Sequence, residues 1–278
     1  ITNLGTTNGW TLYASTLSDP RVITPNTTNI VGGTWTNSPS NSRLISVDGA
    51  ITTSVSAPLV ITDYYGIGSD NNWSNGPMDD LYGENIVYSS DLSDAERYRL
   101  ESYLAIKYGV TLRNGTTSGQ FNYVNSSNAV IWNGNSNTTY HNNVFGIARD
   151  LYGGLNQKVS KTINSDAILT AATTNNFTSN NYDGSRNSLS NDQFVMFGDN
   201  NNTSTALTAL SPVSCPALSD GMFRIAKEWR VQETGVTGPV WIEVDLSGYS
   251  INSDIVLYFG DNAGINGNSG IVSAYSFV

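Results

Sequence analysis

The chain has 278 residues and a net charge of −10, and only 13% of its residues are charged, against about 25% in ordinary globular domains. The acidic balance argues against a nucleic-acid partner, which needs clustered Lys and Arg, and the single Cys215 excludes an internal disulfide. No apolar run approaches the length of about 18 residues that a membrane-spanning helix needs.

Short apolar segments bounded by Gly, Asn, Asp or Pro recur along the chain and predict an all-β protein. The expected strands are rich in Val, Ile, Tyr, Phe and Trp and lie at residues 10–15, 42–47, 58–68, 84–89, 129–134, 193–198, 227–234, 239–246 and 254–260. The dipeptide Asp48-Gly49 follows one of them and predicts a tight hairpin turn. Within residues 239–246, strict alternation places the aliphatic side chains on one face and Trp241 and Glu243 on the other.

Residues 93–108 form the one segment with a helical pattern. Ser93 and Glu96 have the spacing of a capping box, and Gly109 stands where a helix ends. We expect a single amphipathic helix of about four turns that packs on a β domain. Its buried stripe is predicted at Leu100, Tyr103, Leu104, Lys107 and Tyr108.

The stretch after the helix is rich in Gly, Ser and Thr and has no periodicity, which predicts a domain boundary near residue 115. The first domain is expected over residues 1–115 and the second, a β-sandwich, over residues 116–278.

A second Asn- and Ser-rich stretch, residues 173–192, is expected to be a long loop inside the second domain. Residues 193–202 and 255–264 each contain an apolar strand that runs into Phe-Gly-Asp-Asn. They are either a weak duplication or, as we favour, two cases of the same strand-then-turn chemistry.

Two blocks of the sequence resemble known proteins. Residues 64–112 contain a VY…LS turn followed by ERYRLESYLAIKYGVTL, and they resemble the C-terminal end of a concanavalin A-like (laminin-G-like) jelly roll in large surface proteins of Bacteroidota. Residues 140–163 and 227–248 are similar to the uncharacterised β-rich domain that often follows that helix. Such proteins include gliding-motility adhesins and other substrates of the type IX secretion system.

The resemblance implies a partial jelly roll closed by the helix at 93–108, a following β-sandwich, and an extracellular location on the bacterial cell surface. Fewer residues precede the predicted boundary than a complete jelly roll of this kind contains. We therefore expect the chain to be a slice of a longer polypeptide, with the first strands of the jelly roll upstream of Ile1.

Glucanases on concanavalin-like folds carry two Glu around an Asp in the pattern E-x-D-x-x-E. With Asp80 at the centre, the flanking positions are Met78 and Gly83. Asp80 and Glu84 share a strand face but would lie about 13 Å apart, beyond the limit of about 9.5 Å for an inverting pair. One His and one Cys cannot supply a zinc site, and His141 is expected either to satisfy a loop hydrogen bond or to lie at a strand end. We therefore assign no catalytic residue.

Calcium is the more plausible metal, because oxygen-rich loops are frequent in this chain. The first candidates, by analogy with laminin-G domains, are Asp70, Asp79 and Asp80, and Asp199-Asn200 is a similar pair. Asx-turns explain the same residues without a metal.

Carbohydrate binding needs exposed aromatic faces beside amide and carboxylate side chains. Trp73, in the turn-like sequence DNNWSNG, is the best candidate. Its possible neighbours are Tyr64, Tyr65 and Trp35. Trp132 and Trp229 lie in predicted strands and are expected in the core.

Taken together, the sequence favours a non-catalytic structural or adhesive segment of a large secreted surface protein or extracellular filament. Its expected partners are surface glycans or neighbouring copies or domains of the same polypeptide. The alternative is a carbohydrate-binding module of a secreted protein that acts on polysaccharides.

Overall fold

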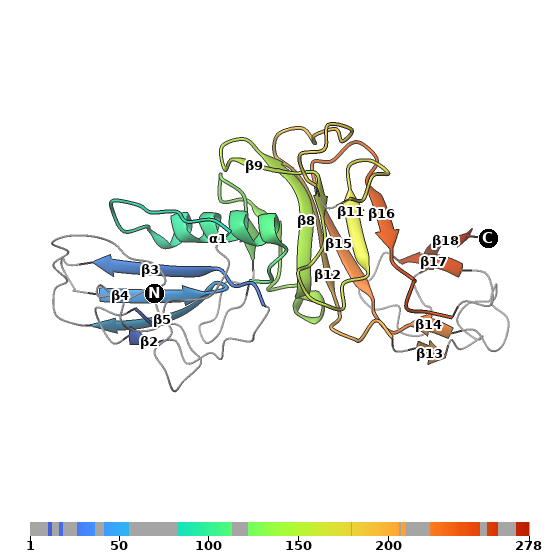
Figure 1. Ribbon diagram of the computed structural model, residues 1–278, viewed down its shortest axis with the longest axis horizontal. Helices are drawn as coiled ribbons and strands as arrows, with labels where there is room; N and C mark the ends of the chain where they lie inside the picture. The colour runs from blue at the N-terminus through green and yellow to red at the C-terminus, as the bar shows by residue number, and fades with distance from the viewer. Residues whose placement is uncertain are drawn as a thin grey trace. The chain divides into compact units, whose positions relative to one another are not determined.

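The computed structural model describes residues 11–12, 17–18, 27–36, 42–55, 83–112, 122–178, 180–205, 207–209, 223–250, 255–260 and 271–277. These residues are mostly β-strands in antiparallel sheets, with α1 (Asp94–Tyr108) as their single α-helix (Figure 1). The predicted all-β class is therefore confirmed.

The chain divides into two compact units. Unit 1 comprises Ile1–Ser136 and Asp150–Leu155, and unit 2 comprises Asn137–Arg149 and Asn156–Val278. The boundary predicted near residue 115 falls outside the described residues and stays a prediction.

Unit 1 contains a three-stranded sheet of β3 (Val31–Thr36), β4 (Ser42–Val47) and β5 (Ala50–Val55). The predicted hairpin turn joins β4 to β5, with φ of 49° at Asp48 and 79° at Gly49. Positive φ at both central residues is the geometry that Asp-Gly favours. The Asp48 carboxylate also accepts the backbone N–H of Ile30 at 2.8 Å, which fixes the segment that leads into β3.

The other described strands of unit 1 are short. They are β1 (Thr11–Leu12), which pairs with β2 (Leu17–Ser18), and β6 (Tyr123–Val124), which pairs with β7 (Val130–Trp132).

Helix α1 begins and ends as its sequence predicts. The Ser93 hydroxyl accepts the backbone N–H of Glu96 at 3.4 Å, and the Glu96 carboxylate accepts the backbone N–H of Ser93 at 2.8 Å. Gly109 follows with a left-handed φ of 65°, and its N–H bonds to the carbonyl of Ala105. The capping box and the C-terminal glycine are thus confirmed.

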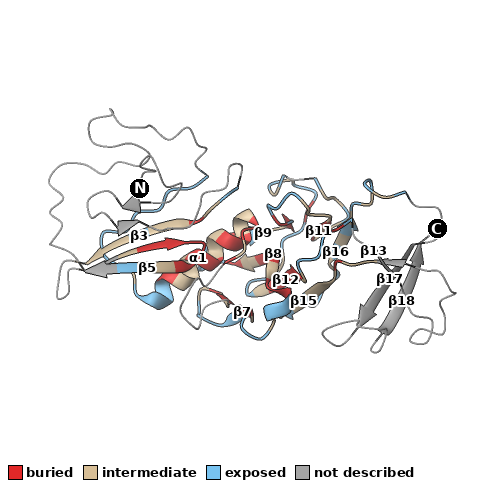
Figure 2. Cartoon of the chain, turned by 90° about the horizontal axis from the view of Figure 1, so that it is seen from below, coloured by how far each residue is buried: buried red, intermediate tan, exposed pale blue. Residues whose placement is uncertain are grey.

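The buried face of α1 differs from the predicted stripe, whose members are only half-buried. Figure 2 shows that buried and intermediate residues alternate along this helix. The residues that are buried are Arg97, Glu101, Ser102, Ala105 and Ile106. This face combines the apolar Ala105 and Ile106 with a polar network. Ser46 of β4 donates a hydrogen bond to Glu101, and Ser102 accepts the backbone N–H of Val124 at 3.0 Å.

The strand predicted at residues 84–89 is wrong, because the segment is not paired with any described strand and its apolar side chains are exposed. Glu84 instead bonds to side chains of α1, with its carboxylate 2.8 Å from the ammonium of Lys107 and 3.3 Å from the hydroxyl of Tyr103. These bonds use Tyr103 and Lys107 of the predicted stripe, whose polar ends therefore face Glu84 and not an apolar core.

Unit 2 contains two larger sheets. One has the order β15-β12-β8-β9, and the other has the order β10-β11-β16. Their bounds are β8 (Asn142–Asp150), β9 (Leu155–Gln157), β10 (Val159–Ser160), β11 (Leu169–Ala172), β12 (Gln193–Asp199), β15 (Trp229–Thr234) and β16 (Trp241–Val244). A 3-10 turn, η2 (Thr138–Tyr140), precedes β8.

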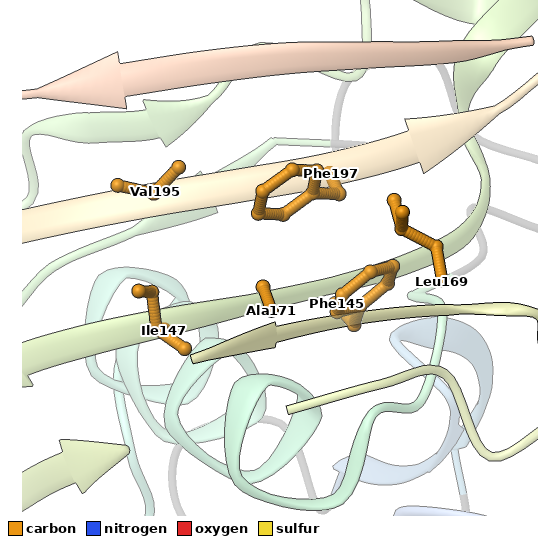
Figure 3. Close-up of a cluster of buried hydrophobic side chains, with 6 residues drawn as sticks. All are labelled: Phe145, Ile147, Leu169, Ala171, Val195 and Phe197. Atoms are coloured by element: carbon orange, nitrogen blue, oxygen red, sulfur yellow. The ribbon is translucent and has the colours of Figure 1, made fainter. Parts of the chain in front are cut away.

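Side chains from both sheets form one buried apolar cluster (Figure 3). Its members are Phe145 and Ile147 of β8, Leu169 and Ala171 of β11, and Val195 and Phe197 of β12. Ile242 and Val244 of β16 pack against the cluster, whereas Trp241 and Glu243 are exposed. The alternation predicted for this strand is confirmed.

The long loop predicted at residues 173–192 is confirmed, since its described part lies between β11 and β12 and contains no helix or strand. The buried Arg186 organises it: the guanidinium donates to the carbonyl of Asn176 at 2.9 Å and to the carbonyls of Thr178 and Asn180. The guanidinium of Arg186 thus satisfies backbone carbonyls that a neighbouring strand would satisfy in a sheet.

Two further strand pairs complete the described part of unit 2. They are β13 (Leu207–Ala209) with β14 (Phe223–Ile225), and β17 (Ile255–Gly260) with β18 (Ile271–Phe277).

Candidate functional site

A buried cation between two carboxylates is the most distinctive polar feature of unit 2. The ammonium Nζ of Lys227 lies 2.8 Å from Oδ2 of Asp199 and 2.7 Å from Oδ2 of Asp166. The side chains of Lys227 and Asp199 are only 2% and 3% exposed, whereas that of Asp166 is 41% exposed. Asp166 therefore lies at the boundary between the buried ion pair and the solvent.

The strand geometry explains why Asp199 faces Lys227. Asp199 is the last residue of β12, and the pairing of β12 with β8 shifts register between Phe197 and Asp199. On its other side Asp199 is paired with Trp229, the first residue of β15, and Lys227 lies two residues before that strand. Asn200 extends the pairing, because its N–H donates to the carbonyl of Glu228 at 3.1 Å.

Two asparagine side chains complete the arrangement. Asn143 of β8 donates its amide Nδ2 to Oδ2 of Asp199 at 2.7 Å, and Asn164 donates to Oδ1 of Asn143. Asn143 has a φ of 52°, a left-handed conformation that Asn tolerates better than most residues. We call these five residues, Lys227, Asp166, Asp199, Asn143 and Asn164, the Lys227 cluster.

The electrostatics of the cluster favour an ion pair in the resting protein. Burial disfavours the charge on Lys227, but the hydrogen bonds to Asp166 and Asp199 outweigh it and raise the pKa of Lys227 above its ordinary value of 10.5. A buried ammonium with two carboxylate partners and amide neighbours is satisfied internally. It joins three segments of unit 2 that are far apart in the sequence.

Most site residues predicted from the sequence fall outside the described residues. These are Trp73, Tyr64 and Tyr65 for a glycan, and Asp70, Asp79 and Asp80 for calcium, and their roles stay predictions. Trp35 is described: it lies in β3, is half-buried and packs against the cluster of Ile45 and Val47. Its indole N–H is buried and has no hydrogen-bond partner among the described residues.

The structure shows an Asx-turn at Asp199, where Oδ1 accepts the backbone N–H of Asn201 at 2.9 Å. This is the metal-free explanation of the Asp199-Asn200 pair, and the cation that Asp199 faces is the ammonium of Lys227. In the part of the chain that is described, no three His, Cys, Asp or Glu residues are grouped so that they could hold a metal ion.

The tryptophans in strands lie largely as predicted. Trp132 of β7 is fully buried, and Trp229 packs against the apolar cluster of unit 2. Trp241 of β16 is 47% exposed and shares its face with Glu243. His141, which directly follows η2, is buried.

Sequence reasoning missed the Lys227 cluster because its partners are remote: Lys227 is 28 residues from Asp199 and 61 from Asp166. Two signals could have indicated it. A lysine two residues before a strand stands out in a chain in which only 13% of the residues are charged, and the Phe-Gly-Asp-Asn sequence places an acid at the end of a buried strand.

Comparison with known proteins places the cluster inside a recognised domain. Residues 96–275, more than half of the chain, match the model of a family described as a domain of unknown function (DUF8202). No curated protein and no solved structure matches the chain. Within the described ranges, no helix combines the length and apolar character needed to cross a membrane.

Proposed function

The chain belongs to the DUF8202 family, and we propose that it is a non-catalytic structural and adhesive segment of a large secreted protein or filament on the bacterial cell surface. We further propose that unit 1 is part of a concanavalin-like jelly roll closed by α1, and that unit 2 is a β-sandwich. The resemblance of residues 64–112 to secreted surface proteins supports the location. The apolar cluster shared by two sheets of unit 2 supports the sandwich.

The observation that carries the structural role is that the charged side chains of the Lys227 cluster pair with one another inside unit 2. Lys227 is 2% exposed, and its ammonium contacts carboxylates from two other segments. An external substrate cannot reach an amine that is 2% exposed. Removal of the Lys227 ammonium would leave the buried Asp199 carboxylate without its cation, at a cost of about 3–5 kcal/mol. The cluster thus holds three segments of unit 2 together, which is a property expected of a domain that bears mechanical force.

The test of the structural role has two measurements. The first is the intact mass of the native polypeptide that carries this segment at the cell surface; a mass far above the 29.9 kDa of the chain is expected. The second is an assay of the purified chain on a panel of polysaccharides, for which no release of sugar is expected. Release of sugar by the chain alone would overturn the non-catalytic proposal.

A specific observation favours the carbohydrate-binding alternative. Trp241 and Glu243 lie on the exposed face of β16, an edge strand of its sheet. An exposed indole beside a carboxylate can stack on a sugar ring while the acid accepts hydroxyl hydrogen bonds. Of the described tryptophans, Trp241 therefore offers the better stacking surface, because Trp35 is half-buried against the core.

Titration calorimetry with soluble glycans tests this alternative. Saturable binding that is lost in Trp241→Ala, or in Trp73→Ala for the surface predicted from the sequence, would support a binding module. The matched control is Tyr182→Ala, which removes an aromatic side chain that is 86% exposed in the long loop. Binding that is equal in all variants would exclude both surfaces.

A further inference from the structure

We propose that Lys227 and Asp199 react with each other to form an intramolecular amide cross-link, with Asp166 as the group that moves the protons. The inference rests on the proposed structural function, because a covalent bond would make permanent the link that the Lys227 cluster forms between segments of unit 2. It follows from three features that meet in the Lys227 cluster: an amine, a carboxyl group held by fixed donors, and a second acid in contact with both the amine and the solvent.

The first feature is the contact between the reacting groups. Nζ of Lys227 is 2.8 Å from Oδ2 of Asp199, and both side chains are almost completely buried. Reacting groups held at van der Waals or hydrogen-bond distance behave as if present at very high concentration. A lysine amine is an established nucleophile toward carbonyl carbon, and the burial of the pair keeps competing bulk water away.

The second feature is the set of donors on the Asp199 carboxyl group. Asn143 Nδ2 lies 2.7 Å from Oδ2, and the backbone N–H of Asn201 lies 2.9 Å from Oδ1. Fixed donors on both oxygens stabilise the negative charge that develops when Cγ becomes tetrahedral. Asn164 donates to Oδ1 of Asn143, which orients the Asn143 amide with its N–H groups toward Asp199.

The third feature is Asp166. Its Oδ2 lies 2.7 Å from Nζ of Lys227, within the range of about 2.6–3.2 Å for a general base. Because the Asp166 side chain is 41% exposed, it can exchange protons with the solvent while it contacts the buried amine.

The step balances without a co-reactant. The Lys227 ammonium gives a proton to Asp166, and the freed electron pair on Nζ attacks Cγ of Asp199 to form the C–N bond. Protonated Asp166 returns that proton to one Asp199 oxygen, a second proton passes from Nζ to the same oxygen, and the C–O bond breaks. An ammonium and a carboxylate thus become an amide and one water molecule, with no oxidation or reduction.

The amide would join Asp199, at the end of β12, to Lys227, which lies two residues before β15. This cross-link would close a loop that contains residues 200–226. A covalent link of this kind restricts the unfolded chain much as a disulfide does. In a chain whose single cysteine excludes an internal disulfide, such a link would provide resistance to force and to proteolysis.

Mass spectrometry of the denatured 278-residue chain tests the proposal. The expected intact mass is lower than that of the sequence by one water molecule. Trypsin should then release residues 187–224 and 225–230 as one branched species, because Asp199 lies in the first peptide and Lys227, no longer cleavable, in the second. A full intact mass overturns the proposal. A water deficit in a chain whose two peptides are released separately, as a succinimide at Asp199 would give, overturns it as well.

Variants assign the roles. Lys227→Arg keeps the charge but cannot form the amide, so it should have full mass, whereas the control Lys161→Arg, at an exposed position, should keep the deficit. A deficit that persists in Lys227→Arg overturns the assignment to Lys227. Asp166→Asn should slow the appearance of the branched species at least tenfold when it is followed from cell-free synthesis of the chain; an unchanged rate overturns the role of Asp166.

If Lys227→Arg does not fold, the peptide map of the unaltered chain still decides whether the bond exists. Failure of the cross-link is also distinguishable from failure of the proposed function. Full mass in a chain that releases no sugar overturns only the bond, whereas release of sugar overturns the structural role whatever the mass.

Discussion

The rings of Phe145 and Phe197 stack almost parallel, with centroids 5.1 Å apart and an interplanar angle of 11°. The two residues are register partners on the neighbouring strands β8 and β12, and both are buried in the apolar cluster of unit 2 (Figure 3). The stack lies directly before the register shift that ends at Asp199. The same pair of strands therefore holds both the stacked rings and two members of the Lys227 cluster, Asn143 on β8 and Asp199 on β12.

We expect Phe197→Ala to lower the free energy of unfolding by about 3–5 kcal/mol, because it leaves a large cavity. Phe145→Ala should cost a similar amount. A double-mutant cycle measured by urea denaturation should give a coupling of about 0.5–1.5 kcal/mol for the stacked rings. Additive losses would show that the stack contributes nothing beyond burial.

Gly146, on β8, lies opposite Met196 of β12, and a Cβ at this glycine would be 2.4 Å from the Met196 sulfur and 2.7 Å from the backbone carbonyl of Val195. Gly146→Ala should therefore destabilise unit 2 by about 1–3 kcal/mol through overpacking. Gly184→Ala is the control, since a Cβ there meets no atom within 4 Å. Equal thermal stability of the two variants would contradict the close approach.

Glu101 predicts a pH effect on stability. Burial raises the pKa of Glu101 above its ordinary value of 4.5, although Ser46 and Arg97 act in the opposite direction. The folded state therefore binds a proton that the unfolded state has released, and stability contributed by Glu101 falls as pH rises from about 4.5 through the folded pKa. Glu101→Gln should remove this contribution. The unfolding free energy of the unaltered chain and of Glu101→Gln, each measured against pH, should therefore change differently with pH. Parallel curves would contradict the raised pKa.

Arg186 predicts local order in the long loop. Its guanidinium donates to backbone carbonyls at Asn176, Thr178 and Asn180. A lysine lacks the planar fork of donors, so Arg186→Lys should raise amide hydrogen exchange across residues 176–186 while leaving β8 and β12 protected. Lys161→Arg, at an exposed position, is the control and should leave the exchange unchanged. Unaltered exchange in Arg186→Lys would show that the loop is ordered by other contacts.

The features that the sequence predicted correctly depend on neighbours in the chain. The capping box at Ser93, the turn at Asp48-Gly49 and the alternation in β16 each involve residues a few positions apart. Local backbone geometry and side-chain periodicity are enough to specify them.

The tertiary structure decided the features that depend on distant residues. It replaced the predicted stripe of α1 with a face centred on Glu101, because Ser46 lies 55 positions away in the chain and donates a hydrogen bond there. It likewise brought Lys227 to Asp199 and Asp166 across 28 and 61 positions. By itself the sequence determined an acidic, low-charge, all-β chain with one capped helix. The buried polar contacts were decided only by the tertiary structure. The packing of the sheets, and not the spacing along the chain, determines which charged side chains lie close together.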